Sequence, residues 1–432
     1  MPKYDVVIFG ATGYTGQFVV EYLAKAVQDK SKEDNSGVTW AVSARSEAKL
    51  DKVLAQASKN TGYDLINTPK IIADVSDEAS LAAMARQAGV VLNCVGPYRF
   101  FGEQVVRACV KEGAHHLDIS GEPQYMEKVQ LSYHDEAAAR GVYVVSACGF
   151  DSIPADVGQI FLSDKMEGDV NSIEGYLKVT TPENVSGPSI NFATFQSAIY
   201  GFAHAKELKG IRKQLFPEKL PKELTPKLKP RGNLHFSEEV SNWCLPFPGS
   251  DRSVMMRTQR ALYANEERRP TQIGVYARFS SLFYAVMTIL CGILFGVLAS
   301  FKFGRKLLED YPGVFSMGNV TKAGPSDEMT KDTNFHWVLV GHGWNKRSSL
   351  VGNFKHDSAP NRRVKVEVKG KNVGYGSTCE CIVQAALCVL KEKDSMPGVG
   401  GVYPPGYAFA KTTLVERLNR NGVTFDAEVT DI

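Results

Sequence analysis

Apolar runs alternate with helix-like stretches over the first third of the chain. Positions 6–9 are all apolar and Gly10 ends the run, which is typical of a strand buried on both faces of a parallel sheet. Apolar residues then recur at helical spacing over 18–27. The alternation continues with strands expected at 38–44, 71–74, 90–95, 116–119 and 142–147 and helices at 81–87, 104–112 and 133–140. It predicts an α/β fold built on a doubly wound parallel sheet.

The pattern changes beyond residue 155. Longer segments have strand character at 172–179 and 363–368, and the second alternates valines with charged residues. Such alternation is typical of a strand with one buried and one polar face. We therefore expect a second α/β domain with a mixed sheet.

Two other segments fit neither pattern. Residues 206–231 hold nine Lys or Arg against three Glu, together with four prolines, and are expected to form an irregular basic excursion. Residues 279–301 contain no Asp, Glu, Lys, Arg or His. As a helix these 23 residues would extend about 35 Å, enough to cross the hydrocarbon core of a bilayer. The segment is predicted to seek a membrane.

Composition and charge bear on partners more than on fold. The 432 residues are 44% hydrophobic and 22% charged, which is ordinary for a folded globular protein. Fifty Lys and Arg against 47 Asp and Glu leave a net charge of +3, so nucleic acid is not expected as a partner. The eight cysteines lack a repeated Cys/His spacing, so no metal site is predicted. The N-terminus has no signal-peptide pattern, and we expect a protein that is not secreted.

The segment after the first strand indicates a specific chemistry. Gly10, Gly13 and Gly16 form the GxxGxxG spacing, a close variant of the dinucleotide fingerprint, between a strand and a helix. The first glycine permits a tight turn, the second lets main-chain N–H groups approach a pyrophosphate, and the third lets the helix pack closely on the sheet. The residues expected to contact a dinucleotide are Gly10, Ala11, Thr12, Gly13, Tyr14, Thr15 and Gly16. The alternative is a tight turn without a ligand.

The end of the second strand bears on which dinucleotide is bound. An acidic residue there would bind the ribose hydroxyls of NAD and repel a 2′-phosphate. The sequence instead has Ser43 and Arg45, which suit the extra phosphate of NADP. NADP is therefore favoured over NAD. A solvated arginine at a helix start is the alternative reading of Arg45.

Later strand ends supply the remaining cofactor candidates. Asp74 ends the third strand, where it could accept a bond from the adenine amino group or cap the following helix. The fourth strand ends in a segment expected to flank the nicotinamide ribose, namely Cys94, Val95, Gly96 and Pro97. Tyr98 could face the reacting carbon, although Gly96 and Pro97 also suit a simple turn.

Polar residues beyond the fifth and sixth strands are candidate proton donors. Asp118, Ser120 and Asp151 lie there, at the edge where ligands bind in open α/β sheets, and Tyr98 is a fourth candidate. Capping of free backbone N–H groups is the competing role, and we favour it for each residue taken singly.

Several blocks together resemble the saccharopine dehydrogenase-like oxidoreductases. These blocks are 10–16, 93–98, 118–122, 149–156 and 401–406, and the resemblance covers essentially the whole chain. It implies a Rossmann domain, a second α/β domain on the substrate side and a C-terminal segment that packs back near the first domain. We place these parts at 1–155, 156–395 and 396–432. The family also includes a eukaryotic branch on lipid droplets and membranes, and bacterial relatives that reduce lipid-linked enoyl groups.

These observations lead to expectations for the apolar segment. A single membrane span would separate two parts of one fold, so we expect 279–301 to form a helical hairpin or a shallow interfacial insertion, bent near Gly292 or Gly296. Basic residues on both sides would meet anionic head groups: Arg278, Lys302, Arg305 and Lys306. A buried core helix or dimer-interface helix is the alternative.

The leading hypothesis is an NADP-dependent reductase acting on a hydrophobic carbonyl, imine or enoyl substrate that is presented at a lipid surface. We expect it on lipid droplets or the cytosolic face of membranes, with a cytoplasmic or mitochondrial pool also allowed. The rival hypothesis is a droplet scaffold that keeps the nucleotide-binding fold without turnover. True saccharopine dehydrogenase activity is less expected, because a tri-carboxylate substrate requires several convergent Arg or Lys residues. A homodimer is compatible with each hypothesis.

Overall fold

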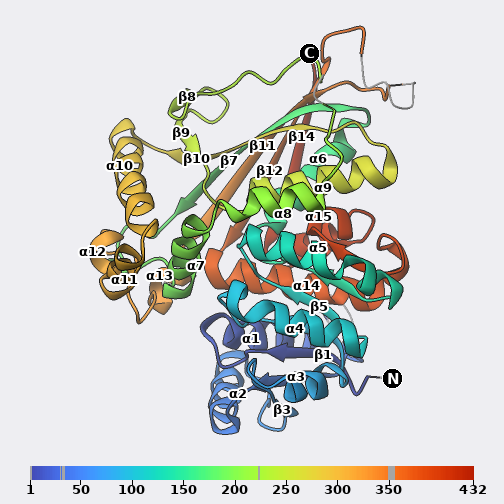
Figure 1. Ribbon diagram of the computed structural model, residues 1–432, viewed down its shortest axis with the longest axis vertical. Helices are drawn as coiled ribbons and strands as arrows, with labels where there is room; N and C mark the ends of the chain where they lie inside the picture. Colours follow the sequence, from blue (N-terminus) through green and yellow to red (C-terminus); the bar gives the residue numbers. More distant parts are fainter. Residues whose placement is uncertain (1, 30, 32–34, 222–223, 349–355) are drawn as a thin grey trace. The chain divides into compact units, whose positions relative to one another are not determined.

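The computed structural model describes residues 2–29, 31, 35–221, 224–348 and 356–432. The chain divides into two compact units (Figure 1). Unit 1 consists of Met1–Asp151 and Gly374–Val423, and unit 2 consists of Ser152–Val373 and Thr424–Ile432. Each unit is built on its own seven-stranded sheet.

Unit 1 contains the parallel sheet that the sequence predicts. Its strand order is β13-β6-β5-β4-β1-β2-β3, and the neighbouring strands all pair in parallel. The strands are β1 (Tyr4–Phe9), β2 (Trp40–Ala44), β3 (Lys70–Ile72), β4 (Ala88–Asn93), β5 (His115–Asp118), β6 (Tyr143–Val145) and β13 (Gly401–Tyr403). The order reverses between β1 and β4, which is where ligands bind in a doubly wound sheet.

Helices pack on unit 1 in two groups. One group contains α1, α2 and α14, and the other contains α3, α4 and α5. The helices are α1 (Tyr14–Gln28), α2 (Glu47–Thr61), α3 (Glu78–Ala85), α4 (Tyr98–Glu112), α5 (Pro123–Ala139), α14 (Thr378–Lys391), α15 (Pro405–Ala408) and α16 (Leu414–Arg420). Short helical turns lie at η1 (Val373–Ser377) and η2 (Lys393–Ser395). The first five helices include all those predicted from apolar periodicity.

The division of the chain differs from the predicted one at its C-terminal end. Residues 374–395 were expected in the second domain, yet α14 contacts α1, β4 and β5 of unit 1. The helix is apolar enough to cross a membrane, but 89% of its apolar window is buried. The expected C-terminal segment 396–432 also divides, because its last residues form β14 (Val423–Asp431) in the sheet of unit 2. Because α14 is buried against elements of unit 1, it belongs to that unit although it follows most of unit 2 in the sequence.

Unit 2 contains the mixed sheet. Its strand order is β14-β12-β11-β7-β10-β9-β8, with β7 and β10 parallel and β11 antiparallel to both of its neighbours. The strands before β14 are β7 (Val170–Thr180), β8 (His235–Ser237), β9 (Asn242–Pro246), β10 (Gln272–Phe279), β11 (Asn334–Gly343) and β12 (Arg362–Lys371). Val364, Val366 and Val368 are fully buried. They face α6 (Ile153–Met166), which covers one side of the sheet beside α9 (Asp251–Glu266).

Unit 2 contains further helices. They are α7 (Phe192–Ala203), α8 (Glu207–Leu215), α10 (Leu282–Ala299), α11 (Lys302–Asp310), α12 (Pro312–Phe315) and α13 (Asp327–Lys331). The expectation of an irregular segment over 206–231 is wrong in its first part, since α8 lies within it. Lysines and arginines are good helix formers, and the first proline of the segment comes only after α8 ends.

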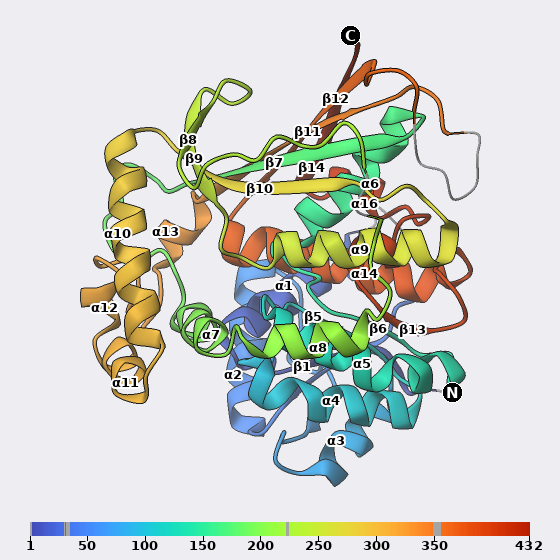
Figure 2. The same ribbon diagram turned by 45° about the horizontal axis from the view of Figure 1, so that its top comes forward.

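The apolar segment forms one uninterrupted helix rather than a hairpin. Helix α10 runs through both Gly292 and Gly296, so the expected bend at these glycines is wrong. The chain turns later, at residues 300–301, and α11 then packs against α10 (Figure 2). Glycine in a helix costs only about 1 kcal/mol, which is too little to end a strongly apolar helix.

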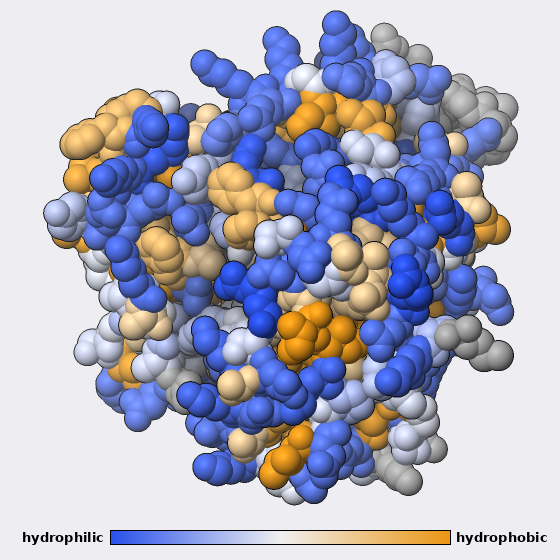
Figure 3. Space-filling model, turned by 60° about the horizontal axis from the view of Figure 1, so that its bottom comes forward, coloured by the Kyte–Doolittle hydropathy of each residue, from blue (hydrophilic) through white to orange (hydrophobic). Residues whose placement is uncertain are grey.

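Helix α10 is largely exposed. Only 11% of its apolar window is buried inside the protein. A small core formed with α7 and α11 holds it on one side, through Phe195, Ile199, Ala299 and Leu308. On the molecular face shown in Figure 3, hydrophilic side chains predominate and apolar ones gather in separate patches. An exposed apolar helix of five turns is unusual on such a surface.

Candidate dinucleotide-binding site

The glycine loop joins β1 to α1 at the reversal of strand order in unit 1. Gly10 has φ +83°, and a Cβ at this position would lie 2.6 Å from Cγ2 of Val95. The backbone N–H groups of Gly10 and Ala11 donate to the carbonyl oxygen of Ser43, at 2.9 and 3.1 Å. These bonds fix the loop against the end of β2. Ser43 therefore acts through its main chain, and its buried side chain is not part of the pocket lining.

The loop leaves the start of α1 open to an anion. Its N-cap is Gly13, and among the described residues no side chain caps the helix. The first turn of a helix presents N–H groups and a partial positive charge, which suit a pyrophosphate. A Cβ at Gly13 would lie 3.2 Å from the Gly10 carbonyl oxygen, in the approach to the loop. The geometry thus fits the roles expected for the first two glycines.

Gly16 holds α1 against the loop, and this contact can be tested. A Cβ at Gly16 would overlap the carbonyl oxygen of Gly10. We expect Gly16→Ala to lower the free energy of unfolding by about 1–3 kcal/mol and to weaken NADPH binding, because α1 must shift. Gly37→Ala is the matched control, since a Cβ there meets nothing within 4 Å. Urea unfolding and calorimetric titration measure both effects; equal behaviour of the two variants would contradict this close packing.

A pocket at the ends of β1, β2 and β4 gathers many of the predicted residues. Seven of them line it: Gly10, Thr12, Gly13, Arg45, Cys94, Val95 and Gly96. The other predicted cofactor residues, which do not line it, are Ala11, Tyr14, Thr15, Gly16, Ser43, Asp74 and Pro97. The sequence interpretation missed the apolar lining of Phe9, Ala44, Ala73, Val75 and Phe101. Most of these residues lie at or next to predicted strand ends, and this position could have identified them as pocket residues.

Arg45 lies at the mouth of this pocket. Its side chain is 76% exposed, and its Nε lies 3.8 Å from Oδ2 of Asp74. Asp74 accepts bonds from the backbone N–H and hydroxyl of Ser76, and these bonds are the main cause that lowers its pKa. Asp77, not Asp74, caps α3. The capping alternative for Asp74 is therefore wrong, and Arg45 keeps donors free to reach solvent or a phosphate.

Tyr98 points into the protein. Its hydroxyl donates to the carbonyl oxygen of Asn93 at 2.9 Å, and the ring is 7% exposed. Its backbone N–H and that of Arg99 donate to the two carboxylate oxygens of Glu122, at 2.9 and 3.0 Å. Glu122 thereby satisfies the first turn of α4. The expectation that Tyr98 faces the reacting carbon thus differs from the geometry, in which the tyrosine locks the turn after β4.

Asp118 is the centre of a buried hydrogen-bond network. Its carboxylate accepts bonds from the hydroxyls of Tyr125 and Ser146, at 2.9 and 2.8 Å, and from the backbone N–H of Ser120 at 3.0 Å. Burial raises the pKa of Asp118 to about 6 despite these bonds. Ser120 accepts a bond from the backbone N–H of Glu122. Both side chains thus fix the segment after β5, as the capping alternative anticipated for Ser120.

Asp151 closes the first stretch of unit 1, immediately before unit 2 begins. Burial raises its pKa to about 6. It does not line the pocket at the glycine loop. The four proton-donor candidates therefore do not converge on that pocket.

His116 makes a pH-dependent contribution beside this network. Burial lowers its pKa to about 3, so the folded chain holds it neutral while an unfolded chain binds a proton below about pH 6.5. Stability from this group is present above pH 6.5 and is lost as the pH falls. The free energy of unfolding should fall between pH 7 and pH 5. We expect this fall to be about 2 kcal/mol smaller for His116→Gln than for the natural chain. Denaturant titrations at both pH values measure it; identical losses would contradict the assignment.

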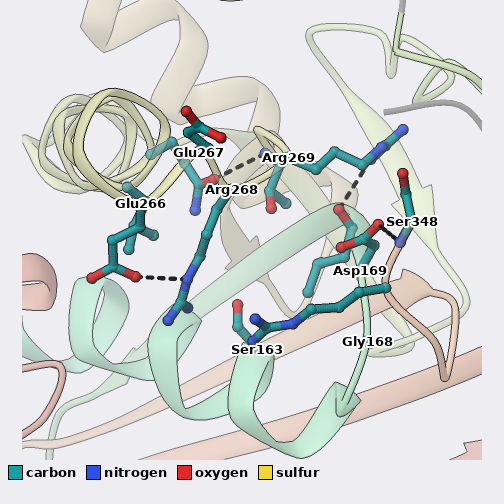
Figure 4. Close-up of a pocket in the computed structure, with 13 residues that line it drawn as sticks. Ser163, Gly168, Asp169, Glu266, Glu267, Arg268, Arg269 and Ser348 are labelled. Carbon is teal, nitrogen blue, oxygen red and sulfur yellow. Dashed lines mark hydrogen bonds and ion pairs between the residues drawn. The ribbon is translucent and has the colours of Figure 1, made fainter. Parts of the chain in front are cut away.

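A second pocket lies within unit 2 (Figure 4). Its charged side chains largely bond to each other or to the main chain: Arg268 pairs with Glu266, and Arg269 donates to the carbonyl oxygen of Val170. Asp169 accepts from the backbone N–H of Ser348 at 2.8 Å. These bonds hold the start of β7 in place, and no predicted site residue lies there. Among the described residues, no cluster of His, Cys, Asp or Glu could hold a metal ion.

The doubly wound sheet, the glycine loop and Arg45 define unit 1 as the dinucleotide-binding part of an oxidoreductase. Residues 6–145 match the family model described as saccharopine dehydrogenase NADP binding domain. The chain is 40% identical to the human saccharopine dehydrogenase-like oxidoreductase, over 98% of this chain and 96% of that protein. The chain belongs to the saccharopine dehydrogenase-like oxidoreductase family and carries its NADP-binding domain.

Two further comparisons extend this relation. The chain is 39% identical to the "Lipid droplet localized protein" of Caenorhabditis elegans, over 99% of both proteins. The structure of apo saccharopine dehydrogenase (L-Glu forming) from Saccharomyces cerevisiae matches with a TM-score of 0.55 and 13% identity, covering 99% of this chain and 100% of that one. The low identity makes this last likeness one of fold alone.

Proposed function

We propose that the protein is an NADP-dependent reductase whose hydrophobic carbonyl, imine or enoyl substrate is presented at a lipid surface. The observation that carries the proposal is that one chain combines an NADP-binding domain, in which Arg45 lines a pocket at the glycine loop, with the exposed apolar helix α10. The name of the nematode relative, which places that protein on lipid droplets, supports the second element. We expect this protein on droplets or on the cytosolic face of membranes.

The residues of unit 1 would bind and orient the cofactor. The open first turn of α1 would bind the pyrophosphate, and the guanidinium of Arg45 would bind the 2′-phosphate. The apolar lining from Phe9, Val75 and Phe101 would exclude water from one wall. Bound NADPH supplies a hydride, and one proton completes the reduction of the substrate. The hydroxyl of Tyr98 is committed to Asn93, so the proton comes from another group or from solvent.

The commitment of Tyr98, Asp118 and Ser120 to structural bonds favours a second candidate function. A droplet scaffold that binds NADPH without turnover needs no proton donor. The experiment has two arms: calorimetric titration with NADPH, then NADPH oxidation in the presence of a lipid extract. Binding with extract-dependent oxidation supports the reductase. Binding without oxidation in any extract supports the scaffold, and absence of binding contradicts both.

A further inference from the structure

The face of the unit 2 sheet opposite α6 carries a row of basic side chains across four neighbouring strands. His336 on β11 pairs with Lys178 on β7 and with Lys369 on β12. On β10, Ala277 pairs with Leu177, and Arg278 and Lys178 are the next residues along these two strands. We call Arg278, Lys178, His336 and Lys369 the cation row; burial lowers the pKa of His336, so the charges of the row are those of Arg278, Lys178 and Lys369. Strands lie about 4.8 Å apart, so the row extends about 14 Å.

Such a row is unfavourable unless an anion compensates it. Like charges on neighbouring strands repel one another. The carboxylate next to the row is that of Glu367, which Lys369 and Lys365 contact at 2.5 and 2.7 Å and His336 at 3.3 Å. Hydrogen bonds from Lys365 and Lys369 lower the pKa of Glu367 to about 2, so its carboxylate is ionised and shared between these two lysines. Positive charge remains in excess on this face.

Arg278 has hydrogen-bonding capacity that its neighbours leave unused. Its Nε donates to Oδ1 of Asn242 at 3.0 Å, which fixes the guanidinium. In the part of the chain that the structure describes, its Nη1 is buried and has no hydrogen-bond partner. A buried donor without a partner is energetically unfavourable. Burial also lowers the pKa of Arg278, which a bound anion would reverse.

The cation row lies where the lipid-seeking helix begins. Strand β10 ends at Phe279, one residue after Arg278, and α10 begins at Leu282. Helix α10 contacts both β9 and β10. A lipid surface that receives α10 would therefore lie close to the row, and phosphate is the anion that such a surface offers.

We propose that the cation row binds the phosphates of anionic lipid head groups at the surface that α10 enters. The inference rests on the lipid-surface part of the proposed function and adds recognition of lipid charge. Because the row is longer than a single phosphate, it suits two adjacent head groups or one with several phosphates. Binding would offset the repulsion along the row.

Vesicle flotation of the full chain tests the proposal. The probes are vesicles of phosphatidylcholine alone and of phosphatidylcholine mixed with a phosphatidylinositol phosphate. The variant Lys178→Gln/Arg278→Gln removes two charges of the row. Its control is Lys52→Gln/Lys59→Gln, which removes two exposed charges from α2. We expect the row variant to lose roughly thirtyfold in binding to mixed vesicles, to keep its binding to neutral vesicles, and the control to keep both.

The other outcomes overturn the inference in distinguishable ways. Equal losses in both variants would mean that only diffuse charge matters. Displacement of the protein from mixed vesicles by soluble glycerol phosphate would make the row a site for a free phosphate compound. A wild-type dimer in sedimentation that the row variant loses would make the row a protein interface. If the wild type failed to bind neutral vesicles, the proposal that α10 enters a lipid surface would be contradicted. NADPH binding, measured separately, would be unaffected by that result.

Discussion

Replacing Arg45 by Asp should weaken NADPH binding about a hundredfold or more and leave NADH binding nearly unchanged. The guanidinium is exposed at the mouth of the glycine-loop pocket and is held by Asp74 only at 3.8 Å. A charge-assisted hydrogen bond contributes about 1.5–3 kcal/mol, and an aspartate would add repulsion against the 2′-phosphate. An aspartate at this strand end also suits the ribose hydroxyls of NADH. Calorimetric titration with each cofactor measures the change.

Arg86→Asp is the matched control for this substitution. Arg86 also lies in unit 1 and makes an exposed ion pair with Glu112, away from the pocket lining. We expect it to leave both affinities unchanged. Equal loss of NADPH and NADH in Arg45→Asp would show that Arg45 supports the fold of the loop rather than binding the 2′-phosphate.

Polar substitution of α10 should release the protein from lipid. The variant replaces four exposed apolar residues by serine: Leu290, Ile293, Leu294 and Val297. Full burial of one such side chain contributes about 1.5–3 kcal/mol, so four together should lower partitioning to droplets more than a hundredfold. Flotation of isolated droplets with the added protein measures it.

The fold should tolerate this change, because each of the four side chains is more than half exposed. The free energy of unfolding in urea should therefore change little, and the affinity for NADPH should equal that of the natural chain. Ile66→Ser with Val399→Ser, two exposed apolar residues of unit 1, is the control for apolar loss in general. If the α10 variant still floats with droplets, the helix is a protein interface.

The sequence predicted those parts of the fold that local patterns determine. Buried apolar runs located β1 to β6, and glycine spacing located the loop, because each glycine meets a local steric need at Gly10, Gly13 and Gly16. Arg45 was identified for the same reason, since it directly follows a strand.

Tertiary contacts decided what the sequence could not. Nothing local distinguishes a tyrosine that faces a cofactor from one whose hydroxyl bonds to Asn93, so the role of Tyr98 required the structure. The apolar residues of α14 and of α10 look alike in sequence, yet 89% of one apolar window and 11% of the other are buried. The cation row depends on the pairing of β10, β7, β11 and β12, which no local pattern specifies.

The return of α14 to unit 1 has a consequence for biosynthesis. Strand β13 and helix α14 supply an edge of the first sheet and a cover for β4 and β5, and they are encoded after all but nine residues of unit 2. On the ribosome, the nucleotide-binding unit therefore stays incomplete until after α10 has been translated. The exposed apolar helix α10 emerges before the cofactor domain can close. Early delivery of the nascent chain to a lipid surface or a chaperone would therefore protect α10 and the incomplete unit 1 from aggregation.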